Sequence, residues 1–243
     1  MHVPIYFLAE SDLLYVWDKS TIEGKAIIFV LMFLSIFAWS VMAGKALQMR
    51  RAKKLNAFFE LEFRAQKHVL DVYDRRLLVP DCPLFMVYQE GSRELDTRLR
   101  GAGGGTPGGE RRRWVSIKSM EHVKRTLERT VAQQALKLES GLIMLAIAVS
   151  GAPFLGLLGT VWGVMSAFSY VAMKGSADLK TMAPGVSGAL ITTVAGLLVA
   201  IPSMFGYNWL VHNLRVQTVT LDNFAQELTS HMETEYLQEE DEL

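Results

Sequence analysis

Four hydroxyl side chains lie inside long uncharged runs of this sequence, and they are its main candidates for chemistry. Thr160 lies in one run, and Ser187, Thr192 and Thr193 lie in the next. A threonine or serine inside a helix commonly donates its hydroxyl to the carbonyl four residues back. That local bond is the favoured interpretation for any one of them taken alone, and a functional role within the membrane is the alternative.

Titratable groups are missing from the same runs. Between residues 140 and 211 the only charged residues are Lys174, Asp178 and Lys180. Proton and ion paths through a membrane usually need a titratable group at depth. If this chain conducts protons, another polypeptide must therefore supply the carboxylate.

Composition excludes several other classes of function. The formal net charge is zero, which argues against a nucleic-acid binder. There is a single cysteine, and no Cys/His cluster has metal-ligand spacing, so neither a metal nor another cofactor is predicted. Residues 103–108 match G-x-G-x-x-G, but no strand precedes this glycine-rich stretch. With no nucleophile and base, no P-loop and no acid pair at membrane depth, the chain is not expected to be an enzyme.

Three apolar runs are long enough to cross a bilayer. They cover residues 26–44, 140–173 and 181–211. The first spans roughly 28 Å as a helix, which is about the hydrocarbon thickness of a bilayer. The sequence predicts an all-α membrane protein with three transmembrane helices and long cytoplasmic helical extensions.

Basic residues after the first run set the orientation by the positive-inside rule. They place the N-terminus outside, in the periplasm if this is a bacterial inner-membrane protein, and the C-terminus in the cytoplasm. The predicted order is an outer interfacial segment (1–25), span one (26–44), a cytoplasmic helical domain (45–139) with a flexible loop (101–109), span two (140–171), an outer loop (172–183), span three (184–210), and a cytoplasmic helix with an acidic tail (211–243).

Apolar side chains at helical spacing predict a helical bundle in the cytoplasmic part. Residues 45–79 are expected to continue the first helix, with apolar positions at Leu55, Phe58, Phe59 and Phe63. From residue 111 a helix is expected to run unbroken into span two, with a stripe at Trp114, Ile117, Met120, Val123, Leu127 and Val131. After span three the stripe is Leu221, Phe224, Leu228 and Met232.

Small residues repeat every four positions in spans two and three. The sets are Ala152, Gly156 and Thr160; Gly159, Gly163 and Ala167; and Gly188, Thr192, Gly196 and Ala200. Such ridges let helices approach closely. We expect spans two and three to be the contact helices of an assembly, because the two ridges on neighbouring faces of span two offer more surface than one partner needs. Packing of the two helices within one subunit is the alternative. Span one is bulky, which suits a helix facing lipid, and Pro153 and Pro202 allow bends in the other two.

Two blocks of sequence resemble the TolQ/ExbB/MotA proton-channel family. The stretch 151–168 contains G-T-V-W-G, and the stretch 183–202 begins A-P-G and ends A-I-P, with Tyr-Asn at 207–208. The three-span arrangement resembles TolQ and ExbB rather than four-span MotA. The strong resemblance covers about residues 139–211.

This resemblance implies a proton-channel stator subunit of a motor driven by the proton-motive force at the cell envelope. It implies a homopentamer around two copies of a single-span partner of the ExbD/TolR kind, which carries a membrane aspartate, with lipid around the assembly. Threonines at the positions of Thr160 and Thr193 line the proton path in the family, and Thr192 and Ser187 are assigned to the same path.

One position departs from the family pattern. A glutamate usually stands two residues before the leucine in P-G-I-x-E-A-L, and this chain has Gly188 there. Either the path relies on the partner's aspartate and the hydroxyls, or Ser187 and water substitute, or the chain no longer conducts. We favour the first because the threonines are kept. The alternative function is a non-conducting membrane scaffold or an assembly subunit of a transport complex.

Overall fold

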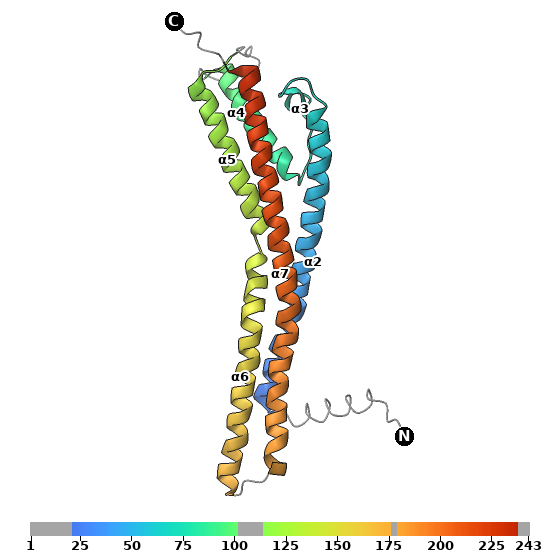
Figure 1. The fold of residues 1–243 in the computed structure, drawn as a ribbon, viewed down its shortest axis with the longest axis vertical. Helices are drawn as coiled ribbons and strands as arrows, with labels where there is room; N and C mark the ends of the chain where they lie inside the picture. Colours follow the sequence, from blue (N-terminus) through green and yellow to red (C-terminus); the bar gives the residue numbers. More distant parts are fainter. Residues whose placement is uncertain (1–20, 102–113, 176–178, 238–243) are drawn as a thin grey trace, which may run out of the picture. The chain divides into compact units, whose positions relative to one another are not determined.

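The computed structural model describes residues 21–101, 114–175 and 179–237, with side chains described from residue 182 in the last range. Every regular element in these ranges is a helix (Figure 1): α2 (Ile22–Arg64), α3 (Asp71–Asp74), α4 (Pro83–Arg100), α5 (Ile117–Glu139), α6 (Leu142–Lys174) and α7 (Leu179–Tyr236). The predicted all-α fold is confirmed. The predictions for residues 1–20, the glycine-rich loop and the acidic end of the tail lie outside the described residues.

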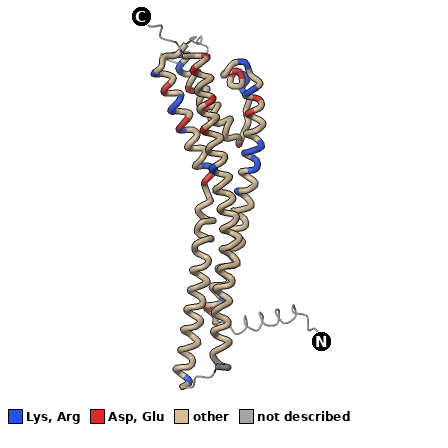
Figure 2. The backbone as a smooth tube through the Cα atoms, viewed as in Figure 1, with Lys and Arg blue, Asp and Glu red and all other residues tan. Residues whose placement is uncertain are grey.

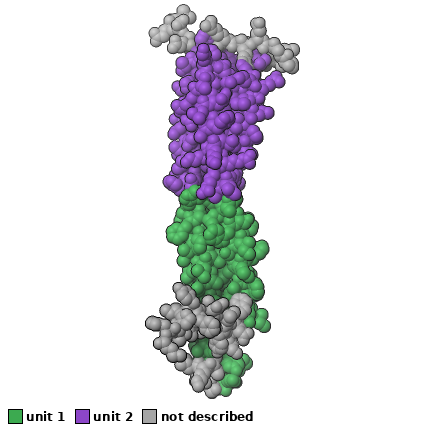
Figure 3. Space-filling model, turned by 90° about the vertical axis from the view of Figure 1, so that its right-hand side faces the viewer, with its two compact units in different colours: residues 1–44, 141–210 green, residues 45–140, 211–243 purple. Residues whose placement is uncertain are grey.

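The chain divides into two compact units, which are coloured separately in Figure 3. The first unit, residues 1–44 and 141–210, contains the apolar runs. The second, residues 45–140 and 211–243, contains the charged helices. Helices α2 and α7 each supply residues to both units.

Within the described residues, three helices are long and apolar enough to cross a membrane. The most apolar 18-residue windows of α2, α6 and α7 have mean hydropathies of 2.5, 2.1 and 1.9. Figure 2 shows long uncharged stretches along these helices. The window in α2 is 11% buried, against 33% in the other two, and the exposed side chains of α2 include Phe33 and Trp39. This exposure fits the predicted lipid-facing role of the first span.

A glycine separates α5 from α6, where an unbroken helix was expected. Gly141 has φ 85°, in the left-handed region that a glycine adopts without steric cost. Its neighbour Ser140 has an extended ψ of 134°. The prediction of one continuous helix through residue 140 is therefore wrong.

Helix covers part of the predicted outer loop. The helix α6 extends to Lys174, where Gly175 with φ 69° ends it. The next helix, α7, begins at Leu179 rather than at residue 184. The connection between these two helices is therefore shorter than the predicted 172–183.

The first helix ends at Arg64 rather than continuing to residue 79. The Gln66 amide donates to the carbonyl of Phe63 at 3.2 Å, and its oxygen accepts from the N–H of Val72 at 2.9 Å. This side chain therefore satisfies backbone groups that a longer helix would have bonded to itself, which is how polar side chains compete with a helix.

An aromatic cluster lies at the core of the second unit. Phe59 and Phe63 contact each other, and both contact Tyr88 and Phe224, with ring centroids 5.2 to 6.5 Å apart. The Tyr88 hydroxyl donates to the carbonyl of Val69 at 2.7 Å, and burial raises its pKa to about 12. The stripe of α7 is buried as predicted, and so are Met120, Val123, Leu127 and Val131 of α5. Three residues assigned to the stripes, Phe58, Trp114 and Ile117, are instead exposed.

The buried side-chain amide of Asn56 binds the first turn of α4. The Asn56 oxygen on α2 accepts from the N–H of Leu84 at 3.2 Å and from the Cys82 thiol at 3.4 Å. The Cys82 sulfur in turn accepts from the N–H of Phe85 at 3.4 Å. Burial raises the pKa of this thiol, and its sulfur caps the helix.

Candidate functional site

Glycines bring α6 and α7 into backbone contact within the first unit. A Cβ added at Gly156 would lie 2.8 Å from the carbonyl oxygen of Thr192, and one at Gly196 would lie 2.6 Å from the carbonyl oxygen of Ala152. At Gly163 it would meet the Ala189 Cβ at 2.6 Å. The small residues therefore form a flat contact surface between two helices of the same chain, which is the alternative to the expected contact between subunits.

Thr192 is the central hydroxyl of this contact. It is fully buried, and its oxygen lies 2.6 Å from the carbonyl oxygen of Ala189 on its own helix and 2.9 Å from that of Gly156 on α6, so its one proton is shared between the two carbonyls. Its side chain fills the space that a Cβ at Gly159 would need. Both acceptors are backbone carbonyls, so this hydroxyl can tie the two helices together.

Thr160 and Thr193 form a pair beside this tie. The Thr193 hydroxyl is 3.2 Å from the carbonyl of Gly156 and 3.5 Å from the Thr160 hydroxyl. Thr160 donates to the carbonyl of Leu157 at 2.7 Å. Both side chains are only partly buried. Two hydroxyls on different helices are therefore adjacent at the edge of the contact, where they remain accessible to a ligand or partner.

The remaining predicted positions occupy different environments. Ser187 is exposed, and Gly188, at the position of the family glutamate, is buried. Pro153 and Pro202 lie inside α6 and α7. Each proline leaves the carbonyl four residues earlier without its helical donor.

The described parts of α6 and α7 offer no carboxylate, ammonium, guanidinium or imidazole group along their contact. The charged residue of α6 is Lys174, at its last position, and from Met182 to Leu210 there is none in α7. Among the described residues no group of three His, Cys, Asp or Glu could hold a metal ion. The site can therefore exchange hydrogen bonds, whereas acid–base chemistry requires a group from elsewhere.

The first helix also contacts α7, which the small-residue pattern did not indicate. Gly206 lies against the Met42 side chain, so closely that an added Cβ would collide with its sulfur. Leu31 of α2 is buried with Ala152, Val199 and Ala200. Gly206 stands outside the four-residue repeats, whereas Ala152 and Ala200 belong to them, so the repeats did not reveal that α2 also packs on these helices.

Comparison with known proteins places these features in a family. Residues 105–223 match the model of the MotA/TolQ/ExbB proton channel family. The chain is 32% identical over 193 residues to the Tol-Pal system protein TolQ of Pseudomonas aeruginosa, covering 79% of each chain. It is 30% identical over 229 residues to TolQ of Haemophilus influenzae, covering 91% of this chain and 94% of that one.

An ExbB is similar to the same extent. The biopolymer transport protein ExbB of Neisseria meningitidis is 29% identical over 202 residues, covering 83% of this chain and 88% of the relative. The family match includes the paired threonines and the glycines of the α6–α7 contact. The three apolar helices and these similarities show that the chain belongs to the MotA/TolQ/ExbB proton channel family.

Proposed function

We propose that this chain is the proton-channel stator subunit of a TolQ/ExbB-like motor. Five copies surround two copies of a single-span partner, and proton flow through the complex drives mechanical work at the cell envelope. The observation that carries the proposal is the hydroxyl pair of Thr160 and Thr193, 3.5 Å apart at the edge of the α6–α7 contact. In the proposed complex this pair lines the proton path.

The partner supplies the group that changes its protonation state. Support comes from the described parts of α6 and α7, which carry no carboxylate where the threonines lie. A span of the ExbD/TolR kind with one aspartate would bring this carboxylate beside the hydroxyls. A threonine hydroxyl donates to a carboxylate and accepts from a protonated one, so the pair can serve both states.

The proposed location is the bacterial inner membrane. Lys45, Arg50, Arg51, Lys53 and Lys54 follow the first span directly. The positive-inside rule puts this segment in the cytoplasm, with the N-terminus in the periplasm and the C-terminus in the cytoplasm.

Proton flux into proteoliposomes that contain the intact complex tests the proposal. Thr160→Val keeps the side-chain shape but removes the hydroxyl. We expect flux to fall about tenfold or more, which is the effect of roughly 1.4 kcal/mol on a barrier. Thr160→Ser, which keeps the hydroxyl, should conserve most of the flux. The matched control is Ser150→Ala, because Ser150 is exposed on the same helix and donates to its own helix at the carbonyl of Ala146.

Absence of flux from the intact, partner-bound complex would refute the conducting role and favour a non-conducting scaffold. The glycine at residue 188 is the observation behind that alternative. A Gly188→Glu variant that turned a non-conducting complex into a conducting one would show that the hydroxyls alone are insufficient. Native mass spectrometry of the complex from its own membranes tests the five-to-two stoichiometry.

A further inference from the structure

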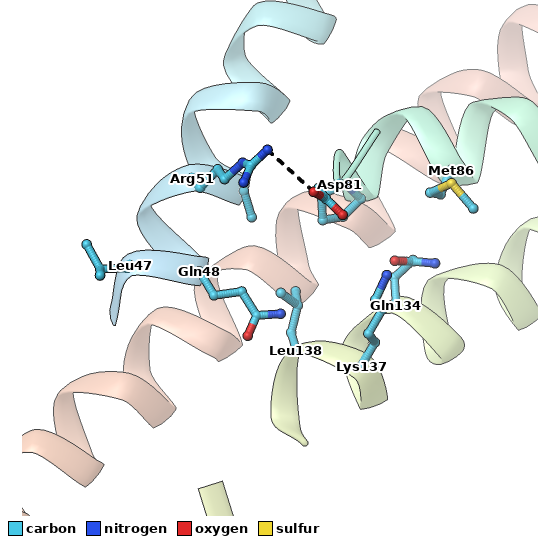
Figure 4. Close-up of a pocket in the computed structure, with 10 residues that line it drawn as sticks. Leu47, Gln48, Arg51, Asp81, Met86, Gln134, Lys137 and Leu138 are labelled. Atoms are coloured by element: carbon cyan, nitrogen blue, oxygen red, sulfur yellow. Dashed lines mark ion pairs between the residues drawn. The ribbon is translucent and has the colours of Figure 1, made fainter. Parts of the chain in front are cut away.

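A cavity of about 350 Å³ lies between α2, α4 and α5 in the second unit. Figure 4 shows the side chains around it: Gln48 and Arg51 come from α2, and Gln134 and Lys137 come from α5. None of these residues takes part in the proposed proton path. The cavity therefore needs its own explanation.

The polar lining of the cavity is suited to an anion. Asp81 is the acidic residue in the lining, and it is paired with Arg51 at 3.5 Å. No acidic side chain of the described ranges pairs with Lys137. The Gln48 oxygen accepts from the Lys45 ammonium at 2.9 Å, so its N–H donors remain for another acceptor. An ammonium, an amide and a guanidinium thus line one small cavity.

Two of the residues that line the cavity come shortly after the first uncharged run in the sequence, and one comes shortly before the second. Gln48 is four residues and Arg51 seven residues beyond Gly44, where the first uncharged run ends. At 1.5 Å per residue these distances are roughly 6 and 10 Å. Lys137 lies three residues before the second run. The headgroup layer on each side of a bilayer is roughly 5 to 7 Å thick beyond the hydrocarbon. Gln48 therefore comes at the distance of the headgroups along α2, and Arg51 comes just beyond them, within reach through its long side chain.

The surroundings distinguish a lipid from a small ion. Leu47, Met86 and Leu138 add apolar surface to the lining, and Leu47 is 66% exposed. Exposed basic residues continue along α2 at Arg50, Lys53 and Lys54. Basic residues close to a span attract anionic lipid, and an apolar wall suits the glycerol and chain ends of a lipid.

We propose that this cavity binds the phosphate of an anionic phospholipid headgroup. The Lys137 ammonium and the Gln48 amide donate to the phosphate oxygens, while Arg51 shares its charge between Asp81 and the lipid. The acyl chains leave the cavity along Leu47. Bonds from a charged donor to phosphate are the strong class of hydrogen bond, so this contact would hold a lipid in place. The proposal does not depend on proton conduction.

Native mass spectrometry of the delipidated intact complex tests the site. Titration with phosphatidylglycerol should give one tightly held lipid per copy of the chain, and phosphatidylcholine should not reproduce it. Lys137→Gln should weaken retention of phosphatidylglycerol about tenfold, as expected for loss of one charged hydrogen bond. The control Lys118→Gln removes the same charge from an exposed position of the same helix and should leave retention unchanged. Lys137→Arg keeps the charge and should restore most of the binding.

Three results would overturn the proposal. The first is equal retention of the two lipids. The second is a Lys137→Gln complex that retains phosphatidylglycerol as well as the Lys118→Gln complex does. The third arm adds glycerol 1-phosphate without lipid: Lys137-dependent binding of this soluble phosphate, with no binding of phosphatidylglycerol, would assign the cavity to a free phosphate compound.

Discussion

Gly156 is the position where a single added methyl group should separate two membrane helices. In Gly156→Ala the new Cβ would lie 2.8 Å from the carbonyl oxygen of Thr192 and 3.0 Å from the Cα of Thr193. Both are backbone atoms, so no side chain can rotate away. Ordinary contact begins near 3.4 Å. The helices must therefore move apart by about 0.6 Å, the difference between 3.4 and 2.8 Å.

This movement would also stretch the hydrogen bonds across the contact. The carbonyl of Gly156 accepts from Thr192 at 2.9 Å and from Thr193 at 3.2 Å. An extra 0.6 Å brings the first to the limit of a hydrogen bond and breaks the second. Overpacking costs about 1–3 kcal/mol, and hydrogen bonds between membrane helices contribute about 0.6 kcal/mol each. The better helix propensity of alanine offsets about 1 kcal/mol, which leaves a destabilisation of roughly 1–3 kcal/mol.

Gly151→Ala is the matched control. Gly151 lies on the same helix five residues earlier, and no atom lies within 4 Å of a Cβ added there. This variant should be neutral or slightly more stable, because it gains helix propensity without a collision. The assay is thermal unfolding of the purified complex in detergent, followed by size-exclusion chromatography. Equal midpoints for the Gly156→Ala and Gly151→Ala complexes would refute the close packing of α6 on α7.

Two further predictions concern the second unit, and both are checked by denaturant unfolding of the full chain. Asn56→Ala should destabilise it by about 1–3 kcal/mol, because the N–H of Leu84 at the start of α4 loses its buried acceptor. An unchanged unfolding midpoint would contradict this role of the amide. Tyr88→Phe should cost a similar amount, because the hydroxyl donates to the carbonyl of Val69 and accepts from the N–H of Tyr73. The folded-state pKa of Tyr88, about 12, exceeds the ordinary 10, so its stabilising effect is complete below pH 10 and is lost as the pH rises toward 12. The difference in stability between wild type and Tyr88→Phe should therefore shrink over this range, and a constant difference would contradict the buried phenol.

The glycines and the threonines of α6 and α7 are expected to have different roles. Gly156, Gly159, Gly163 and Gly196 determine how closely α6 and α7 approach, because a Cβ at each would collide with the other helix. The hydroxyls then exchange bonds across the gap that the glycines leave. A change at a glycine should therefore alter stability first, and a change at Thr160 should alter conduction first.

The residue types and the lengths of the uncharged runs predict the helical class and a close helix contact without any structure. Three charge-free runs are long enough to cross a bilayer as helices, in which every backbone hydrogen bond is made within the segment. The four-residue spacing of small side chains predicted a close helix contact, and Gly156, Gly163 and Gly196 lie in it. The absence of carboxylates from the spans is the sequence observation behind the proposed partner, which stays a prediction.

The tertiary structure determines which threonine hydroxyl is buried in the contact and which lies at its edge. Thr192 and Thr193 are adjacent in sequence, yet Thr192 is fully buried in the contact and Thr193 is paired with Thr160 at its edge. Successive helical residues point about 100° apart. Their environments therefore depend on the side from which α6 approaches, and no local pattern contains this long-range information.

The same reason explains the helix ends and the cavity. The helix α2 stops at Arg64 because Gln66 bonds to the backbone of α3, and α5 separates from α6 where Gly141 adopts a left-handed conformation. The cavity is lined by residues that are far apart in sequence, such as Gln48 and Lys137, and these residues come together only when their helices pack. Sequence periodicity reports which residues share a face of one helix, whereas contacts between helices arise only when the whole chain packs.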